Sequence, residues 1–184
     1  MIVETEHTPN PDTLKFLPGK IVSDIGPVEF KKEDKNIEVP LANKILSLEG
    51  TVMVFFGKDF ITVKKEQELN WKDLKHGIIS EINEYYSKGN NVVISKKLKQ
   101  SSEETRDKSD EIINKINEVL DTKIRPAVAR DGGDITFKSF DHGVVTVELK
   151  GSCSGCPSSV MTLKQGVQNL LCHYIPEVKS VEAI

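Results

Sequence analysis

The sequence predicts an α+β protein made of two small domains, and three observations support this fold class. Its 184 residues are 38% hydrophobic and 29% charged, which is ordinary for a globular chain long enough to form one or two compact cores. Strand and helix patterns lie on both sides of residues 95–108, a stretch of mostly charged and small polar side chains. That composition is typical of a flexible linker. We therefore expect a first domain over residues 1–94 and a second over residues 109–184.

The first domain should combine short strands with two helices. Prolines interrupt residues 2–22, which favours brief strands joined by turns, and residues 40–48 predict a short helix with Pro40 in its first turn. Residues 51–56 and 60–65 are rich in β-branched and aromatic side chains and predict a hairpin. A longer helix, capped by Asn70 and ended by Gly89, is predicted by apolar residues at helical spacing. These residues are Trp71, Leu74, Ile78, Ile82 and Tyr85.

The sequence of the second domain predicts the element order α-β-β-α-β, which would form a small sheet with helices on one face. Ser109 is placed to cap its first helix, which should end near Pro126, and the alternation over residues 134–150 predicts an antiparallel hairpin that turns at 141–143. Pro157 should begin the next helix, and residues 178–184 should form the last strand. The first helix should bury Ile112, Ile116, Val119 and Ile124, and the second Val160, Leu163, Val167, Leu170, Leu171 and Tyr174.

Composition excludes several classes of function. A net charge of -3, with no strongly basic segment, argues against a nucleic-acid partner. The longest wholly apolar run, residues 52–56, is far shorter than the roughly 20 residues of a membrane-spanning helix, so we expect a soluble protein with no membrane partner. The first residues contain no signal or transit pattern, which favours a cytoplasmic bacterial protein or a processed mitochondrial-matrix chain.

The chemistry of the chain is expected at Cys153 and Cys156, which are separated by two residues. Gly155 allows the tight turn that would aim both sulfur atoms at one centre, and the start of a helix at Pro157 favours the thiolate form. Three cysteines in all argue against a secreted disulfide framework. The pair is therefore predicted to be a metal or redox site.

A count of the available ligands indicates that this loop would supply only half of an iron–sulfur site. Such clusters usually need four thiolates. Cys172 would lie roughly 20 Å farther along the helix, and neither His142, in a hairpin turn, nor His173, beside Cys172, is well placed. Two copies of the loop, related by a two-fold axis, would complete the site, so the sequence predicts a cluster-bridged homodimer. Both [4Fe-4S] and [2Fe-2S] clusters fit four thiolates.

Other interpretations of the cysteine pair are less favoured. A thiol–disulfide oxidoreductase is the main alternative, but thioredoxin-like enzymes place their motif within a βαβ unit, whereas a hairpin precedes it here. Structural zinc would need a second ligand pair. Gly132-Gly133 lacks the lysine and hydroxyl residue of a phosphate loop and is expected to form a turn close to the cluster loop. No substrate-binding set accompanies the cysteines, so we do not expect an enzyme.

Long stretches of the chain resemble a known family. IRPAVARDGGDITF (124–137), GSCSGCPSSVMTLKQGVQNLL (151–171) and YIPEV (174–178) are similar to the C-terminal domain of NifU-like (Nfu) proteins. TPNPDTLKF (8–16) and the later EG (49–50) resemble the N-terminal domain that accompanies it. The resemblance implies a scaffold or carrier that binds a [4Fe-4S] cluster across a homodimer through Cys153 and Cys156. It also implies an upstream cluster donor and apo iron–sulfur target proteins as partners.

Overall fold

The computed structural model describes residues 2–34, 37–95, 110–154 and 157–184, and it divides into two units, Met1–Lys99 and Gln100–Ile184. Each unit has its own sheet and its own hydrophobic core, as the predicted α+β fold requires. The predicted linker over residues 95–108 lies outside the described residues from position 96 onward, so its boundaries stay a prediction. No helix in the described ranges is long and apolar enough to cross a membrane.

The first unit contains a five-stranded antiparallel sheet in the order β1-β2-β5-β4-β3. The predicted hairpin is confirmed, because β4 and β5 pair on either side of the turn that contains Gly57. The edge strand β3 is an element that the sequence did not predict. The strands are β1 (Glu4–His7), β2 (Thr13–Leu17), β3 (Val28–Lys31), β4 (Thr51–Phe56) and β5 (Ile61–Lys65).

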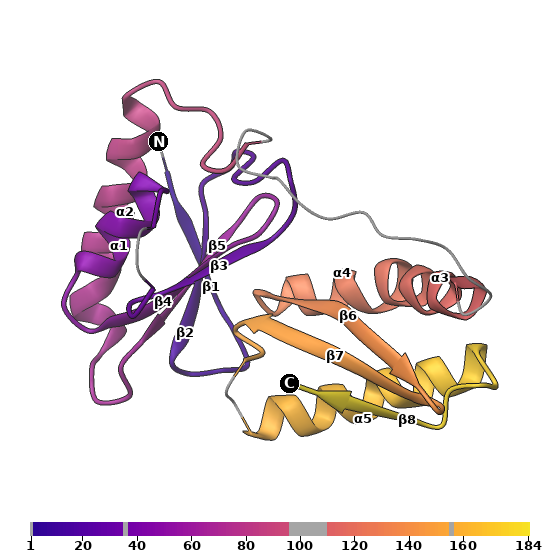
Figure 1. The fold of residues 1–184 in the computed structure, drawn as a ribbon. Helices are drawn as coiled ribbons and strands as arrows, with labels where there is room; N and C mark the ends of the chain where they lie inside the picture. Colours follow the sequence, from indigo (N-terminus) through magenta and orange to yellow (C-terminus); the bar gives the residue numbers. More distant parts are fainter. Residues whose placement is uncertain (1, 35–36, 96–109, 155–156) are drawn as a thin grey trace. The chain divides into compact units, whose positions relative to one another are not determined.

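Two helices, α1 (Pro40–Ser47) and α2 (Trp71–Ser87), cover one face of this sheet (Figure 1). Both were predicted, and Pro40 does occupy the first turn of α1. Asn70 precedes α2 but forms no side-chain cap, and the buried residue at its end is Tyr86, whereas the predicted Tyr85 is partly buried. The core between helices and sheet therefore depends on apolar side chains at helical spacing.

The first helical region of the second unit continues beyond its predicted end. It consists of α3 (Asp110–Val119), a π-helical segment η2 (Leu120–Ile124) and α4 (Arg125–Arg130). Pro126 lies in the first turn of α4, where its missing N–H costs no hydrogen bond, so the chain remains helical for another turn. The wider π turn offsets the angular drift of a four-residue spacing, so Ile116 and Leu120 before it and Ile124 and Val128 after it all face the core.

The sheet of the second unit has the order β6-β7-β8. Strands β6 (Gly133–Asp141) and β7 (Val144–Gly151) form the predicted antiparallel hairpin, whose turn places His142 and Gly143 at positive φ. Strand β8 (Ser180–Ala183) pairs parallel to β7. One face of this sheet joins the helices in a common core.

Helix α5 (Pro157–Tyr174) begins at the predicted proline. Val167 and Leu171 are buried as expected, and Val160 and Leu163 are partly buried against the core. Leu170 and Tyr174, however, are 36% and 49% exposed, so the predicted buried stripe is too wide. Leu170 lies at the margin of the stripe, and Tyr174 is the last residue of the helix.

Candidate functional site

The described part of the cysteine loop follows β7 and leads toward α5. Cys153 lies two residues after Gly151, whose φ is +69°, and its side chain is only 5% exposed within the core of the second unit. Cys156 lies outside the described residues, so the proposed pairing of the two sulfur atoms stays a prediction. The structure therefore fixes one of the two predicted ligands at the buried base of the loop.

Gly133 gives the Cys153 side chain the space it occupies. A Cβ atom at position 133 would lie 2.6 Å from the carbonyl oxygen of Lys150 and 2.8 Å from the sulfur of Cys153, both closer than atoms normally approach. Any larger residue would force the backbone or the thiol to move. Gly133, which was expected to lie in a turn beside the cysteine loop, is instead the first residue of β6 and leaves this space to the thiol.

Hydrogen bonds hold the beginning of the cysteine loop against the same turn. The backbone N–H of Ser152 donates to the carbonyl oxygen of Gly132 at 3.2 Å, and the Ser152 hydroxyl donates to the carbonyl oxygen of Asp131. Ser154 donates from its backbone N–H and its hydroxyl to the carbonyl oxygen of Gly151, at 3.2 and 3.0 Å. The chain entering the site is therefore anchored on both sides of Cys153.

An ion-pair chain fixes the strand that contains Gly133. Arg125 contacts Asp121 at 2.8 Å and Asp134 at 3.3 Å, and its Nε also donates to the carbonyl oxygen of Ile135 at 3.0 Å. Burial raises the pKa of Asp134, an effect that the Arg125 charge opposes. Its second carboxylate oxygen has no hydrogen-bond partner among the described residues. No sequence pattern indicated this pairing, because the arginine and the aspartate belong to different elements.

The other residues considered as ligands, His142, His173 and Cys172, do not surround a common centre. His142 is 93% exposed in the hairpin turn, and the ring of His173 stacks against Tyr174 at the end of α5. Cys172 is partly buried and packs against the core of the second unit. Within the described ranges, no three cysteine, histidine or acidic side chains are grouped to hold a metal ion.

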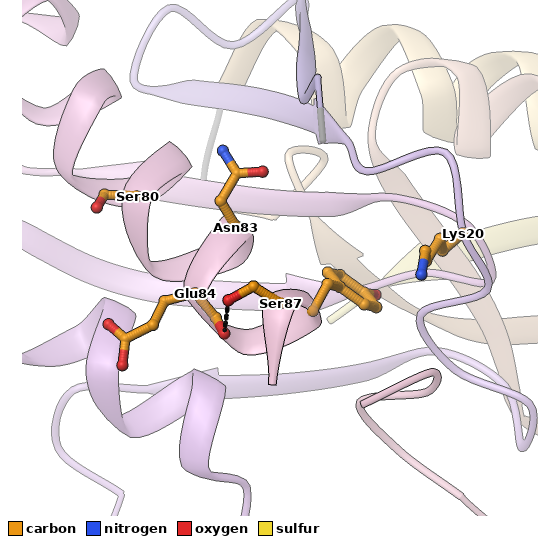
Figure 2. A pocket seen from close by; sticks show the side chains of 6 residues that line it. Lys20, Ser80, Asn83, Glu84 and Ser87 are labelled. Carbon is orange, nitrogen blue, oxygen red and sulfur yellow. Dashed lines mark hydrogen bonds between the residues drawn. The ribbon is translucent and has the colours of Figure 1, made fainter. Parts of the chain in front are cut away.

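A hollow of about 550 Å³ lies in the first unit beside the C-terminal half of α2 (Figure 2). The Lys20 ammonium lies 5.5 Å from the centre of the Tyr86 ring, and the Ser87 hydroxyl donates to the carbonyl oxygen of Glu84 at 2.9 Å. Among the described residues, Tyr86 Oη and Asn83 Oδ1 are buried without a partner. The hollow is lined by Lys20, Ser80, Asn83, Glu84, Tyr86 and Ser87, which offer no thiolate for a cluster.

Comparison with known proteins covers both units. The model of the NifU-like domain matches residues 116–182, and that of the scaffold protein Nfu/NifU N-terminal domain matches residues 3–89. The human protein named "NFU1 iron-sulfur cluster scaffold homolog, mitochondrial" is 44% identical over 100% of this chain and 72% of its own length. The chain belongs to the NifU-like (Nfu) family. Its two units correspond to the two domains that the family resemblance implied.

Two further proteins are similar to all or part of this chain. "NifU-like protein 4, mitochondrial" from Arabidopsis thaliana is 42% identical over 99% of this chain and 65% of its own length. The solution structure of a NifU-like protein from Saccharomyces cerevisiae shares 29% identity, with a TM-score of 0.48, over 52% of this chain and 86% of that one. The chain thus spans about two thirds to three quarters of the curated relatives compared.

Proposed function

We propose that this chain is an iron–sulfur cluster scaffold and carrier rather than an enzyme. It binds one [4Fe-4S] cluster between two protomers through Cys153 and Cys156 and delivers the cluster to apo target proteins. Relatives named as cluster scaffolds support the general role. Their mitochondrial names support action in the matrix for a eukaryotic chain, and a bacterial chain would act in the cytoplasm.

The observation that carries this proposal is the anchored cysteine loop with an incomplete ligand set. Cys153 is held at the end of β7 by bonds from Ser152 to the turn at residues 131–132. A cluster of either common type needs four thiolates, whereas this loop contributes two. A second copy of the loop supplies the remainder, which couples cluster binding to dimer formation.

The burial of Cys153 supports delivery over permanent retention. Its thiol belongs to the core of the second unit and contacts the position next to Gly133 Cα. A cysteine packed in this way behaves as a small apolar side chain. When it ligates a cluster, its sulfur must face the cluster, and some core packing is lost. Release of the cluster restores that packing. The free energy regained by the apo protein therefore offsets part of the free-energy cost of giving up the cluster.

Anaerobic reconstitution of the full chain with iron and sulfide tests the proposal. We expect a coloured dimer with about four irons per pair of chains, whereas a [2Fe-2S] cluster would give about two. Incubation with an apo iron–sulfur protein should then move the colour and the iron to that protein. Light scattering and iron analysis on the same sample report the dimer and its metal content together.

Matched cysteine variants show which thiols are ligands. Cys153→Ser and Cys156→Ser should each abolish the bound cluster, whereas Cys172→Ser should keep the iron content of the parent chain. A protein that stays monomeric and colourless, yet reduces a model disulfide, would contradict the scaffold and favour a thiol–disulfide oxidoreductase.

A further inference from the structure

The hollow beside α2 is lined by polar groups that the fold of the first unit leaves unsatisfied. Tyr86 is only 5% exposed and belongs to the core, yet its hydroxyl oxygen has no hydrogen-bond partner among the described residues. Asn83 Oδ1, on the preceding turn of the helix, is also buried and unpartnered within the described ranges. A buried polar atom without a hydrogen bond costs free energy, and native proteins keep few of them. Two such atoms on residues that line one hollow therefore need an explanation outside the chain itself.

The two groups need opposite partners. Burial raises the pKa of Tyr86 to about 12, so its hydroxyl keeps its proton and can donate a hydrogen bond. The oxygen Asn83 Oδ1 can only accept one. A peptide group offers both partners, because its C=O accepts and its N–H donates. Since residues three apart on a helix are neighbours on its surface, one short stretch of polypeptide can reach both side chains.

The charges around the hollow favour an acidic ligand. Lys20, from the loop after β2, lies across from the α2 residues with its ammonium 5.5 Å from the centre of the Tyr86 ring (Figure 2). In the part of the chain that the structure describes, no carboxylate pairs with it. The acidic residue of the lining, Glu84, is paired with Lys88 at 2.5 Å and Lys44 at 3.1 Å, which hold its pKa below its ordinary value. The positive charge of Lys20 is therefore the one left for a ligand.

We propose that this hollow binds an acidic segment of a partner polypeptide. The Tyr86 hydroxyl donates to a backbone carbonyl oxygen of the segment, Asn83 Oδ1 accepts from a backbone N–H, and Lys20 pairs with an aspartate or glutamate carboxylate. A volume of about 550 Å³ is within the range of small-ligand sites and accommodates one acidic side chain with its flanking peptide groups. The first unit contains no cysteine, so this role in protein recognition goes beyond the proposed function and does not depend on a cluster.

N-acetyl-aspartate N-methylamide is a suitable probe, because it combines two peptide groups with one carboxylate. Titrated into the isotope-labelled apo full-length chain, it should shift the NMR signals of the Asn83 side-chain amide in a saturable manner. A ligand of this size should have a dissociation constant on the order of 1 mM. The neutral N-acetyl-asparagine N-methylamide should bind several-fold more weakly. Sodium acetate, which has no peptide group, should cause no saturable shift, and acetate shifts equal to those of the probe would indicate an adventitious ion only and overturn the proposal.

Substitutions assign the two kinds of contact. Lys20→Gln should abolish the preference for the acidic probe over the neutral one, because it removes the charge and keeps the length of the side chain. Lys72→Gln, at an exposed position near the start of α2, is the matched control and should keep that preference. Tyr86→Phe should weaken the binding of both probes roughly 3- to 10-fold, because one hydrogen bond is lost.

Three other results would overturn the proposal. The first is the absence of a saturable shift up to about 20 mM probe, which is well above the expected dissociation constant. The second is equal binding of the acidic probe to the parent chain and to Tyr86→Phe. The third is a Tyr86→Phe variant that melts at a lower temperature than the parent, because the hydroxyl would then already have a partner such as an ordered water. None of these results bears on cluster binding, which reconstitution measures separately.

Discussion

Gly133→Ala should destabilise the second unit, because the added methyl group enters an occupied space. Its Cβ would lie 2.6 Å from the Lys150 carbonyl oxygen and 2.8 Å from the Cys153 sulfur. Overpacking of this kind costs about 1–3 kcal/mol, and the reduced backbone entropy of alanine returns roughly 0.5–1 kcal/mol. A net loss of about 1–2 kcal/mol corresponds to a melting temperature lower by roughly 5–15 °C for a domain of this size. Calorimetry of the apo chain, following the transition of the second unit, measures this loss.

Two further variants decide whether Cys153 is the cause. Gly166→Ala, in open space on a helix, should raise the same transition, since alanine favours a helix by roughly 1 kcal/mol over glycine. In a Cys153→Ala background the sulfur contact is gone, so Gly133→Ala should cost less than it does in the parent chain. An unchanged melting temperature for Gly133→Ala, or an identical cost in both backgrounds, would refute the packing of glycine against the thiol.

The remaining predictions concern buried polar groups. Tyr86→Phe should raise stability by up to about 1 kcal/mol, because it removes a buried hydroxyl that has no partner among the described residues. Tyr85→Phe should lower stability by about 1 kcal/mol, because the Tyr85 hydroxyl donates to the Val92 carbonyl oxygen at 2.9 Å. Thermal melts in which both variants shift in the same direction would contradict this pair of predictions. Burial raises the pKa of Asp134 above 3.8 in the folded chain, so its contribution to stability is largest below 3.8 and falls as pH rises through the folded pKa. Asp134→Asn should therefore make the midpoint of urea unfolding depend less on pH between about pH 4 and 7. Midpoints that change with pH in parallel for the two proteins would count against this prediction.

The spacing of apolar residues was sufficient to predict a helix or strand wherever one face of that element packs against one core. The stripe along α2 and the alternation in β6 and β7 placed these elements within one or two residues, because their apolar side chains recur at helical or strand spacing. Strand β3 has only 4 residues, of which Val28 and Phe30 face the helices. So short a pattern does not separate an edge strand from a loop. Its pairing with β4 becomes visible only in the folded sheet.

The width of a buried face was not predictable in the same way. Leu170 and Tyr174 follow the apolar pattern of α5 yet remain substantially exposed, because a helical stripe indicates apolar character and not the area that the neighbouring sheet covers. Cys172 shows the converse case. It lies off the main stripe, but it is short enough to pack at the margin of the core.

The features of the candidate site also fall into two groups, those set by local sequence and those set by contacts between distant segments. Cysteine spacing and ligand counting are local properties, so they predicted the loop and its need for a second copy. The contact between Gly133 and Cys153, and the chain from Arg125 to Asp134, depend on how two segments meet in space. That meeting makes Cys153 both a core residue and a proposed ligand. Substitutions around Gly133 should therefore alter stability and cluster binding together.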